Sequence, residues 1–280
     1  MNKYKEIFEE LYEVTGSRVS SLEFLYLLSG IKDVSRLTMR SSHITLFSDL
    51  CKRNNLSFLF SEESYTVPVA SSYRNSLDKT TESLGFCYKE VYISRTVNKV
   101  HDLKEAAANC DHRHVGRILG YPDCCIDFFM SWLALGQLNN MDFSTFASSD
   151  GKEYPYRVNV FSKEFDACYL SHFPCSLNCV DSLNQAKERM LFVKNNLPNI
   201  ESMFIKKMKS CVAYSSRFGT IYSKGFITGE EGALIITPKE EIYINGKLGG
   251  AYDKEMKLVE IAQEVWSNIE KNQIKTVAFI

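Results

Sequence analysis

Cysteine and histidine residues are concentrated in one stretch of this chain, and that concentration restricts its fold more than any other feature. Residues 101–179 contain six of the nine cysteines and four of the five histidines of the 280-residue chain. An odd number of cysteines cannot all pair within one chain, and a disulfide framework is typical of much shorter secreted domains. The stretch therefore predicts a site built from thiol and imidazole groups rather than a disulfide scaffold.

Two short motifs within the stretch place cysteines just after a proline. They are Gly-Tyr-Pro-Asp-Cys-Cys, residues 120–125, and His-Phe-Pro-Cys-Ser-Leu-Asn-Cys, residues 172–179. Each motif lies at or just before a predicted helix start, where unpaired N–H groups and the helix dipole favour the thiolate. A thiolate is the form that binds a metal or attacks an electrophile. We predict four metal ligands: Cys124, Cys125, Cys175 and Cys179.

The spacing of these cysteines bears on the type of metal centre. The three residues between Cys175 and Cys179 fit a zinc site, whereas adjacent residues such as Cys124 and Cys125 rarely both reach one zinc ion. An iron–sulfur cluster is larger and accepts more varied spacing. The sequence therefore favours an iron–sulfur cluster, with zinc as the alternative and a metal-free thiol site as a third interpretation.

Helix geometry narrows the expected ligand set. Neighbouring residues on a helix diverge by about 100°, so we expect one vicinal cysteine, together with Cys175 and Cys179, in a three-thiolate site with an open position. The other vicinal cysteine is then a second cluster ligand, a nucleophile or a packing residue. Other candidates for a fourth ligand are Cys168, His112, His114 and His172.

Four residues near the motifs are candidates for acid–base chemistry or anion binding. His114 shares a predicted helical stripe with Cys110 and Ile118, and His172 precedes Cys175 by three residues; either could move protons. A carboxylate or phosphate is the expected ligand of Arg113 and Arg117, with a solvated helix face as the alternative. The remaining cysteines are expected to pack as small apolar residues: Cys51, Cys87, Cys110, Cys168 and Cys211.

The hydrophobic patterning predicts an α+β fold in three regions: a mixed α/β region at 1–97, a helical cysteine- and histidine-rich region at 98–204, and an antiparallel β-sheet with a C-terminal helix at 205–280. Expected helices span residues 3–14, 20–29, 43–53, 104–119, 123–135, 182–195 and 254–271. Expected strands span residues 56–60, 66–69, 90–94, 211–215, 220–228, 233–237, 241–244 and 276–280. A long loop is predicted at 137–160, and a hairpin turn at Asn245–Gly246.

Composition argues against two classes of partner. Lysine and arginine total 33 against 34 for aspartate and glutamate, so no overall charge attracts nucleic acid. No stretch approaches the roughly 20 apolar residues of a membrane span, and the first residues lack the apolar core of a secretion signal. We therefore expect a cytoplasmic protein that binds neither nucleic acid nor membrane.

At these motifs the chain resembles an uncharacterised prokaryotic family annotated only as a domain of unknown function. The family pattern is Arg-x-x-Gly-x-x-Leu-Gly-Tyr-Pro-x-Cys-Cys followed by Pro-Cys-Ser-x-x-Cys. The matching stretches here are residues 114–125, from His114 to Cys125, and residues 172–179. The resemblance covers about residues 90–195, and it implies a shared cysteine site without implying a reaction.

Together these features predict a metal-dependent enzyme. Its cysteine-ligated centre would carry out redox, sulfur-transfer or lyase chemistry on a small polar or anionic substrate, and a redox centre implies an electron-donor protein as a partner. The alternative is a binding module in which structural zinc organises a partner surface formed by residues 137–160 and the C-terminal sheet. A metal-free thiol enzyme with a histidine base is a further alternative.

Overall fold

The computed structural model of the chain describes residues 3–66, 78–80, 87–134, 141–215, 219–223, 242–245 and 275–280. Helices are combined with two sheets whose strands pair almost entirely antiparallel, which confirms the predicted α+β class. The predicted helix at 254–271 and the predicted strand at 233–237 lie outside the described residues, as does Gly246 of the predicted hairpin turn.

Three helices form in the first part of the chain: α1 (Lys3–Thr15), α2 (Arg18–Ser29) and α3 (Ile44–Arg53), the last preceded by the 3-10 turn η1 (Ser41–His43). The Ser17 side chain accepts the N–H of Ser20 and caps α2, so this helix begins slightly before the predicted position. Gly30 ends α2 as predicted, in the left-handed region with φ of 85°, which a residue without a Cβ adopts freely.

The first sheet comprises β1 (Val34–Arg40), β2 (Ser57–Phe60), β3 (Ser64–Thr66), β4 (Asp78–Thr80) and β5 (Cys87–Ser94). Strand β5 is central: β1 pairs along one side of it, and β2 and β3 pair along the other, all antiparallel. Strand β1 was not predicted, because Arg36 and Arg40 break up its short apolar pattern. The predicted strand at 66–69 is described only at Thr66, the last residue of β3.

The middle of the chain is helical: α4 (Val97–Ala108), α5 (His112–Ile118), α6 (Asp123–Ala134), α7 (Met141–Ala147), α8 (Val180–Asn196) and α9 (Pro198–Met208). The single helix predicted at 104–119 is wrong, since Cys110 takes a left-handed conformation with φ of 55° and separates α4 from α5. Asp111 then caps α5 by accepting the N–H of His114. The segment 137–160 also differs from a plain loop, because α7, the short strand β6 (Glu153–Tyr154) and the 3-10 turn η3 (Tyr156–Val158) form there.

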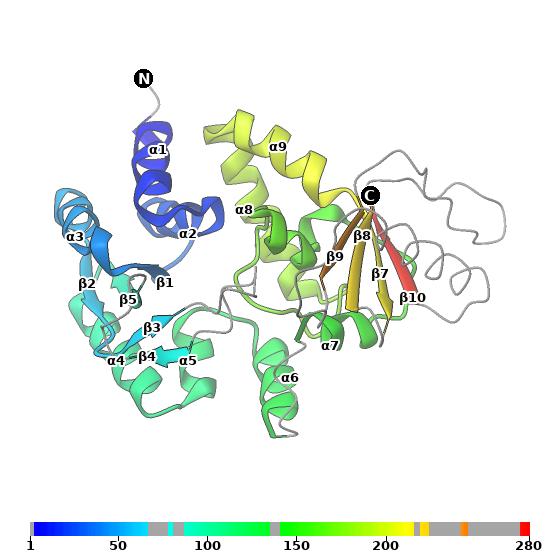
Figure 1. Cartoon of the computed structure of the whole chain (residues 1–280), viewed down its shortest axis with the longest axis horizontal. Helices are drawn as coiled ribbons and strands as arrows, with labels where there is room; N and C mark the ends of the chain where they lie inside the picture. The colour runs from blue at the N-terminus through cyan, green and yellow to red at the C-terminus, as the bar shows by residue number, and fades with distance from the viewer. Residues whose placement is uncertain are drawn as a thin grey trace.

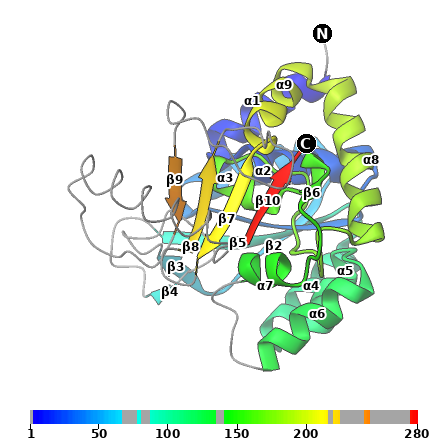
Figure 2. The ribbon, with the colours of Figure 1, turned by 90° about the vertical axis from the view of Figure 1, so that its right-hand side faces the viewer.

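The second sheet contains β6, β7 (Cys211–Ser215), β8 (Gly219–Ser223), β9 (Ile242–Asn245) and β10 (Lys275–Phe279) in the order β6-β10-β7-β8-β9. Among the described strands of this sheet, only the short β6–β10 pair is parallel. Figure 1 shows this sheet at one end of the molecule and the first sheet with α1 to α5 at the other, with α8 and α9 between them. Figure 2 looks onto the second sheet and shows α6 extending away from it.

One cluster of buried side chains joins all three predicted regions. It includes Leu11 of α1, Phe204 of α9 and Phe279 of β10, each almost fully buried. A smaller cluster packs α4 and α5 against β1 and β5, and Val34 and Leu103 are among its most deeply buried members. The region boundaries at 97 and 204 stay a prediction, but the elements on either side of them share a core.

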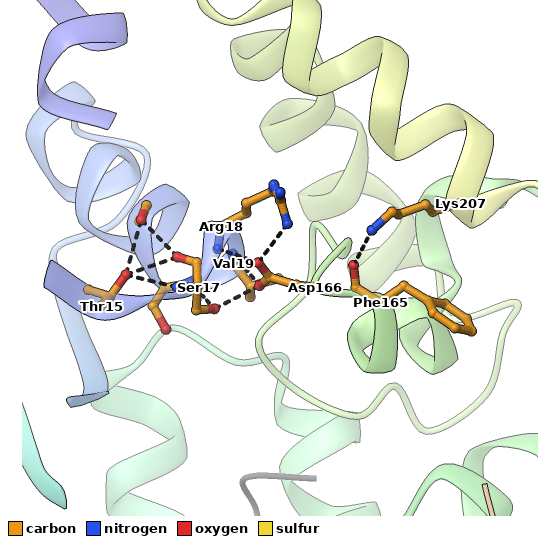
Figure 3. A network of polar contacts seen from close by, with 9 residues as sticks. Thr15, Ser17, Arg18, Val19, Phe165, Asp166 and Lys207 are labelled. Atoms are coloured by element: carbon orange, nitrogen blue, oxygen red, sulfur yellow. Dashed lines mark hydrogen bonds and ion pairs between the residues drawn. The ribbon is translucent and has the colours of Figure 1, made fainter. Parts of the chain in front are cut away.

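Asp166 fastens the N-terminal helices to the middle of the chain. It follows the 3-10 helix η4 (Val160–Phe165) in a left-handed conformation, and its carboxylate accepts the backbone N–H of Arg18 at 2.7 Å and of Val19 at 3.1 Å. It also accepts the Ser17 hydroxyl at 2.8 Å, and Figure 3 shows these bonds converging on the first turn of α2. A carboxylate at this end of a helix satisfies unpaired N–H groups and complements the helix dipole.

We expect Asp166→Ala to lower the free energy of unfolding by about 2–3 kcal/mol, because it removes an N-terminal cap with charged hydrogen bonds and places alanine at positive φ. Asp166→Asn keeps one acceptor and tolerates the backbone conformation, so a loss of about 1 kcal/mol is expected. Urea unfolding measures both. Asp49→Asn, which removes an exposed ion pair with Lys52, is the matched control and should change stability by less than about 0.5 kcal/mol. Equal effects of Asp166→Ala and Asp49→Asn would contradict the fastening role.

Candidate metal centre

The thiol groups of all four predicted cysteine ligands meet at one point. The Sγ atoms of Cys124, Cys125, Cys175 and Cys179 all lie within 4.8 Å of one another. The Cys179 sulfur is 3.6 Å from that of Cys124 and 3.6 Å from that of Cys125, and the two vicinal sulfurs are 3.9 Å apart. Two segments about fifty residues apart in sequence thus supply a compact group of four sulfur atoms that could hold a metal ion.

Helix α6 brings the vicinal cysteines to the centre in its first turn. The carbonyl of Pro122 accepts the N–H groups of Cys125 and Ile126, which starts the helix directly after the proline. A Cβ on Gly116 would lie 2.8 Å from Ile126 Cγ1, so this glycine allows α5 to approach α6 closely. Gly120, with φ of 74°, makes the turn between the two helices.

The second segment arrives through a stretch without regular secondary structure and ends at the start of α8. Cys179 occupies the N-cap position of α8, at the positive end of the helix dipole. Two side chains from the α7 region hold the preceding backbone: the Thr145 hydroxyl donates to the Pro174 carbonyl at 2.7 Å, and Ser149 Oγ accepts the N–H of Leu177 at 2.9 Å. The N–H of Cys175 points at Cys125 Sγ, at 3.4 Å.

Both vicinal cysteines reach the centre, although helix geometry favoured a three-thiolate site and left the role of the other vicinal cysteine open. Side chains on a helix tilt toward its N-terminus, so adjacent residues in the first turn can both reach a point beyond the helix end. The rule that neighbours diverge applies along the side of a helix, whereas this centre lies at the end of one. Cys124 is exposed, so it lies on the solvent side of the centre. Cys125 is 3% exposed, so it lies on the inner side.

Because they lie close together and are partly buried, the four thiol groups differ in pKa. Hydrogen bonds, first from the Cys125 thiol and also from Ser182, lower the pKa of Cys179 to about 4 against the effect of burial. Burial and then the negative charge of Cys179 raise the pKa of Cys175 to about 12. The pKa of Cys125 is raised by the bond its thiol donates to Cys179 and by burial, and burial raises the pKa of Cys124. Without a bound cation, the arrangement supports one thiolate, at Cys179, which accepts hydrogen bonds from the neighbouring thiols.

Ser182 and His172 form a hydrogen-bonded support behind the sulfurs. Ser182 Oγ lies 3.4 Å from Cys125 Sγ and 2.8 Å from His172 Nε2. Burial, followed by the positive charges of Arg189, Lys163 and Lys32, lowers the pKa of His172 well below its ordinary value. A neutral imidazole that donates from Nε2 to Ser182 Oγ leaves the Ser182 hydroxyl free to donate its proton to Cys125 Sγ. His172 Nδ1 has no hydrogen-bond partner among the described residues.

The other proposed acid–base and anion-binding residues lie elsewhere. His114 is exposed and its Nε2 is 2.9 Å from the Asp102 carboxylate, so it does not face the packed side as predicted. Arg113 pairs with Asp127, and Arg117 lies 3.3 Å from Asp123; both pairs link α5 to α6. Of the predicted catalytic residues, the structure therefore brings only His172 to the cysteines.

The remaining cysteines are separate from the centre. Cys51 and Cys168 are buried as small apolar residues, and Cys168 Sγ contacts the carbonyl of Leu170 at 3.2 Å. Cys110 is exposed, contrary to the prediction that it packs on an apolar helix face. Cys87 is half-buried, and the side chain of Cys211 lies outside the described set.

Sequence reasoning missed Ser182, although a signal was present. Cys179 was predicted just before a helix, and the residue three positions after an N-cap faces back toward it. A serine at this position, next to a thiolate, is a hydrogen-bond donor within reach.

Comparisons with protein-family models, with curated proteins and with solved structures found no match to this chain. The resemblance to the family with the two cysteine motifs therefore stays a prediction. Among the helices that the structure describes, none combines the length and apolar character that crossing a membrane requires.

The lowered pKa of His172 predicts a specific pH dependence. An imidazole whose pKa is lower in the folded chain than in the unfolded chain binds fewer protons when folded, so stability falls as the pH drops below about 6.5, by up to about 1.4 kcal/mol per pH unit. His172→Gln keeps a donor near the Nε2 position and does not titrate. We expect its free energy of unfolding to fall less steeply than that of the wild type between pH 6.5 and 5.

Urea unfolding of both proteins at matched metal content measures the two slopes. Proton competition for the thiolates occurs in both proteins and cancels in the comparison. Parallel curves for wild type and variant would rule out a buried neutral His172.

Proposed function

We propose that Cys124, Cys125, Cys175 and Cys179 together bind one zinc ion, and that this zinc centre organises the structure by joining the start of α6 to the start of α8. The observation that carries the proposal is the set of sulfur–sulfur distances, 3.6, 3.6 and 3.9 Å, with all four sulfurs within 4.8 Å. In a tetrahedral zinc site with Zn–S bonds of about 2.3 Å, adjacent sulfurs are separated by about 3.8 Å.

The same distances favour zinc over the iron–sulfur cluster that the sequence suggested. In a [4Fe–4S] cluster each thiolate binds its own iron, and in a [2Fe–2S] cluster the four thiolates are divided between two irons, so the four cysteine sulfurs do not all lie as close together as around one ion. The iron–sulfur enzyme therefore stays a prediction that the sulfur spacing does not support. Zinc was the stated alternative, and the spacing supports it.

The donor set also supports a structural role for the ion. Four thiolates complete the tetrahedral coordination of zinc, and sites closed in this way stabilise folds, whereas catalytic zinc keeps one position for water or substrate. A dication also stabilises the thiolates that burial and mutual repulsion disfavour, so metal binding and ordering of the 172–179 segment are coupled. Ser182 and the Cys175 N–H would orient the Cys125 sulfur from behind.

The first experiment measures the metal that the protein carries. The chain is purified under anaerobic conditions and analysed for zinc, iron and acid-labile sulfide, and its visible spectrum is recorded. We expect a colourless protein with one equivalent of zinc, whose cobalt-substituted form shows the absorption of a tetrahedral thiolate site. A brown protein with iron and sulfide would replace zinc with an iron–sulfur cluster, and a coloured protein with one iron and no sulfide would indicate a mononuclear redox centre.

Substitutions then test the ligand set. Cys124→Ser, Cys125→Ser, Cys175→Ser and Cys179→Ser should each reduce zinc content substantially, whereas Cys110→Ser, a matched change at an exposed cysteine outside the centre, should keep one equivalent. Metal removal from the wild type by a chelator should lower Tm by about 10 °C, since a ligand at roughly a thousand times its Kd contributes about 4 kcal/mol. Full zinc content in all four variants would refute the proposed site.

A further inference from the structure

A cavity lies beside the cysteine centre, at the junction of the N-terminal helices with α5 and α8. Its volume is about 430 Å³, within the roughly 300–1,000 Å³ of small-molecule sites. The turn from α2 into β1 contributes Ile31 and Lys32, the end of α5 contributes Ile118 and Gly120, and α8 contributes Gln185 and Arg189. Residues near the opening such as Gly120 are exposed, whereas Lys32 and Arg189 are 5% and 3% exposed and form its inner wall.

The inner wall carries more positive than negative charge. Lys32 and Arg189 both contact Glu23, a buried carboxylate behind the wall, so two cations share one anion. Glu201, the other buried carboxyl group in the described part of the chain, bonds instead to the hydroxyl groups of Tyr169 and Tyr156. A buried charge without a partner is costly, and a ligand that supplies one negative charge would balance it.

Charges nearer the opening are largely paired among themselves. Lys99 lies 2.7 Å from Asp33, and Arg117 is paired with Asp123. Asp102 contacts His114, and the exposed Glu188 lies on the rim. The surplus positive charge is therefore located at the buried end of the cavity, at Lys32 and Arg189.

Donor geometry suits a carboxylate in this position. Arg189 has five N–H donors in a planar fork; one bonds the Tyr169 carbonyl at 2.9 Å, and another lies 3.5 Å from Gln185 Oε1. Lys32 has three N–H donors, and two of them are directed at Glu23 and Ser171. Helices α2 and α5 both end at this cavity, and the negative ends of their dipoles disfavour a phosphate dianion relative to a single negative charge. Ile31 and Ile118 offer apolar contact to the body of a ligand.

We propose that this cavity binds a small organic monocarboxylate, whose carboxylate is held by Lys32 and Arg189. The inference deepens the proposed function and rests on it in one respect: the zinc centre would position two walls of the cavity. Gln185 on α8, six residues after Cys179, donates to the carbonyl of Gly120, five residues before Cys125, at 2.9 Å. Tyr121 connects the two sites from behind, with its ring 5.1 Å from the His172 ring and 5.9 Å from Lys32 Nζ.

The test compares carboxylates with neutral analogues of the same shape. Butyrate and benzoate are titrated into the zinc-loaded protein at constant ionic strength, beside butyramide, benzamide and inorganic phosphate, by calorimetry and by the shift in Tm. We expect saturable binding of at least one carboxylate in the millimolar range or better, with its amide and phosphate each about tenfold weaker or more. Equal affinities for acid and amide, tighter binding of phosphate, or no binding of either carboxylate would overturn the proposal.

Two substitutions locate the binding site. Arg189→Lys keeps the charge and removes the planar fork, and should weaken carboxylate binding about tenfold or more. Glu23→Gln removes the shared anion and should strengthen it, a result that simple loss of structure would not give. Arg113→Gln, a matched change at an arginine that pairs with Asp127 outside the cavity, should leave the affinity unchanged. The comparison of acids with amides uses only the wild type and decides the question if either variant fails to fold.

Metal content measured on the same samples separates this inference from the proposed function. If the zinc-loaded protein binds no carboxylate, the proposed ligand of the cavity is refuted and the proposed zinc centre is unaffected. A protein that binds carboxylates but never carries zinc refutes the zinc centre and supports the cavity.

Discussion

Four thiol groups occupy a volume in which burial and mutual repulsion allow only one of them to ionise readily. Most of the structure around the centre depends on how that repulsion is relieved. The 172–179 segment has no helix or strand of its own, so it relies on α7 on one side and on the sulfurs on the other. The dication that we propose would convert the repulsion into attraction, and it would join the start of α6 and the start of α8 into a single rigid unit.

A chain of buried polar groups extends from this unit into the interface with the N-terminal helices. Ser182 and His172 lead from the sulfurs, Tyr121 packs against His172, and Lys32 lies over Tyr121 and pairs with Glu23. Such groups contribute little net stability compared with apolar packing, because removing them from water is costly. They do impose one relative placement of the two parts, since each donor and charge needs its partner. Together with the Asp166 bonds to α2, they set the position of the N-terminal helices on the middle of the chain.

Local signals in the sequence were sufficient for elements whose ends carry strong chemistry. Helix α2 ended before Gly30 and α6 began at Asp123, as predicted, because a glycine adopts the left-handed conformation and a proline fixes φ without help from distant residues. Strand β1 was missed because its pairing with β5, some fifty residues later, compensates for a weak local pattern. The break at Cys110 was missed because a cysteine in the left-handed region gives no sequence signal. The grouping of the four cysteines was predictable, since clustering in sequence and position after a proline are both local properties.

The partners of the basic and imidazole side chains were not predictable in the same way. Arg113 and Arg117 have the spacing of an anion clamp, yet aspartates on the next helix bind them both, and only the packing of α5 on α6 reveals this. The buried cations at Lys32 and Arg189 are 157 residues apart and are unremarkable in sequence, although the fold brings both to one carboxylate. Spacing along the chain identifies groups that act through a shared local turn, as the cysteines do. Where a charge is finally balanced depends on tertiary contacts, and for that reason the cysteine centre could be found from the sequence while the cavity beside it required the structure.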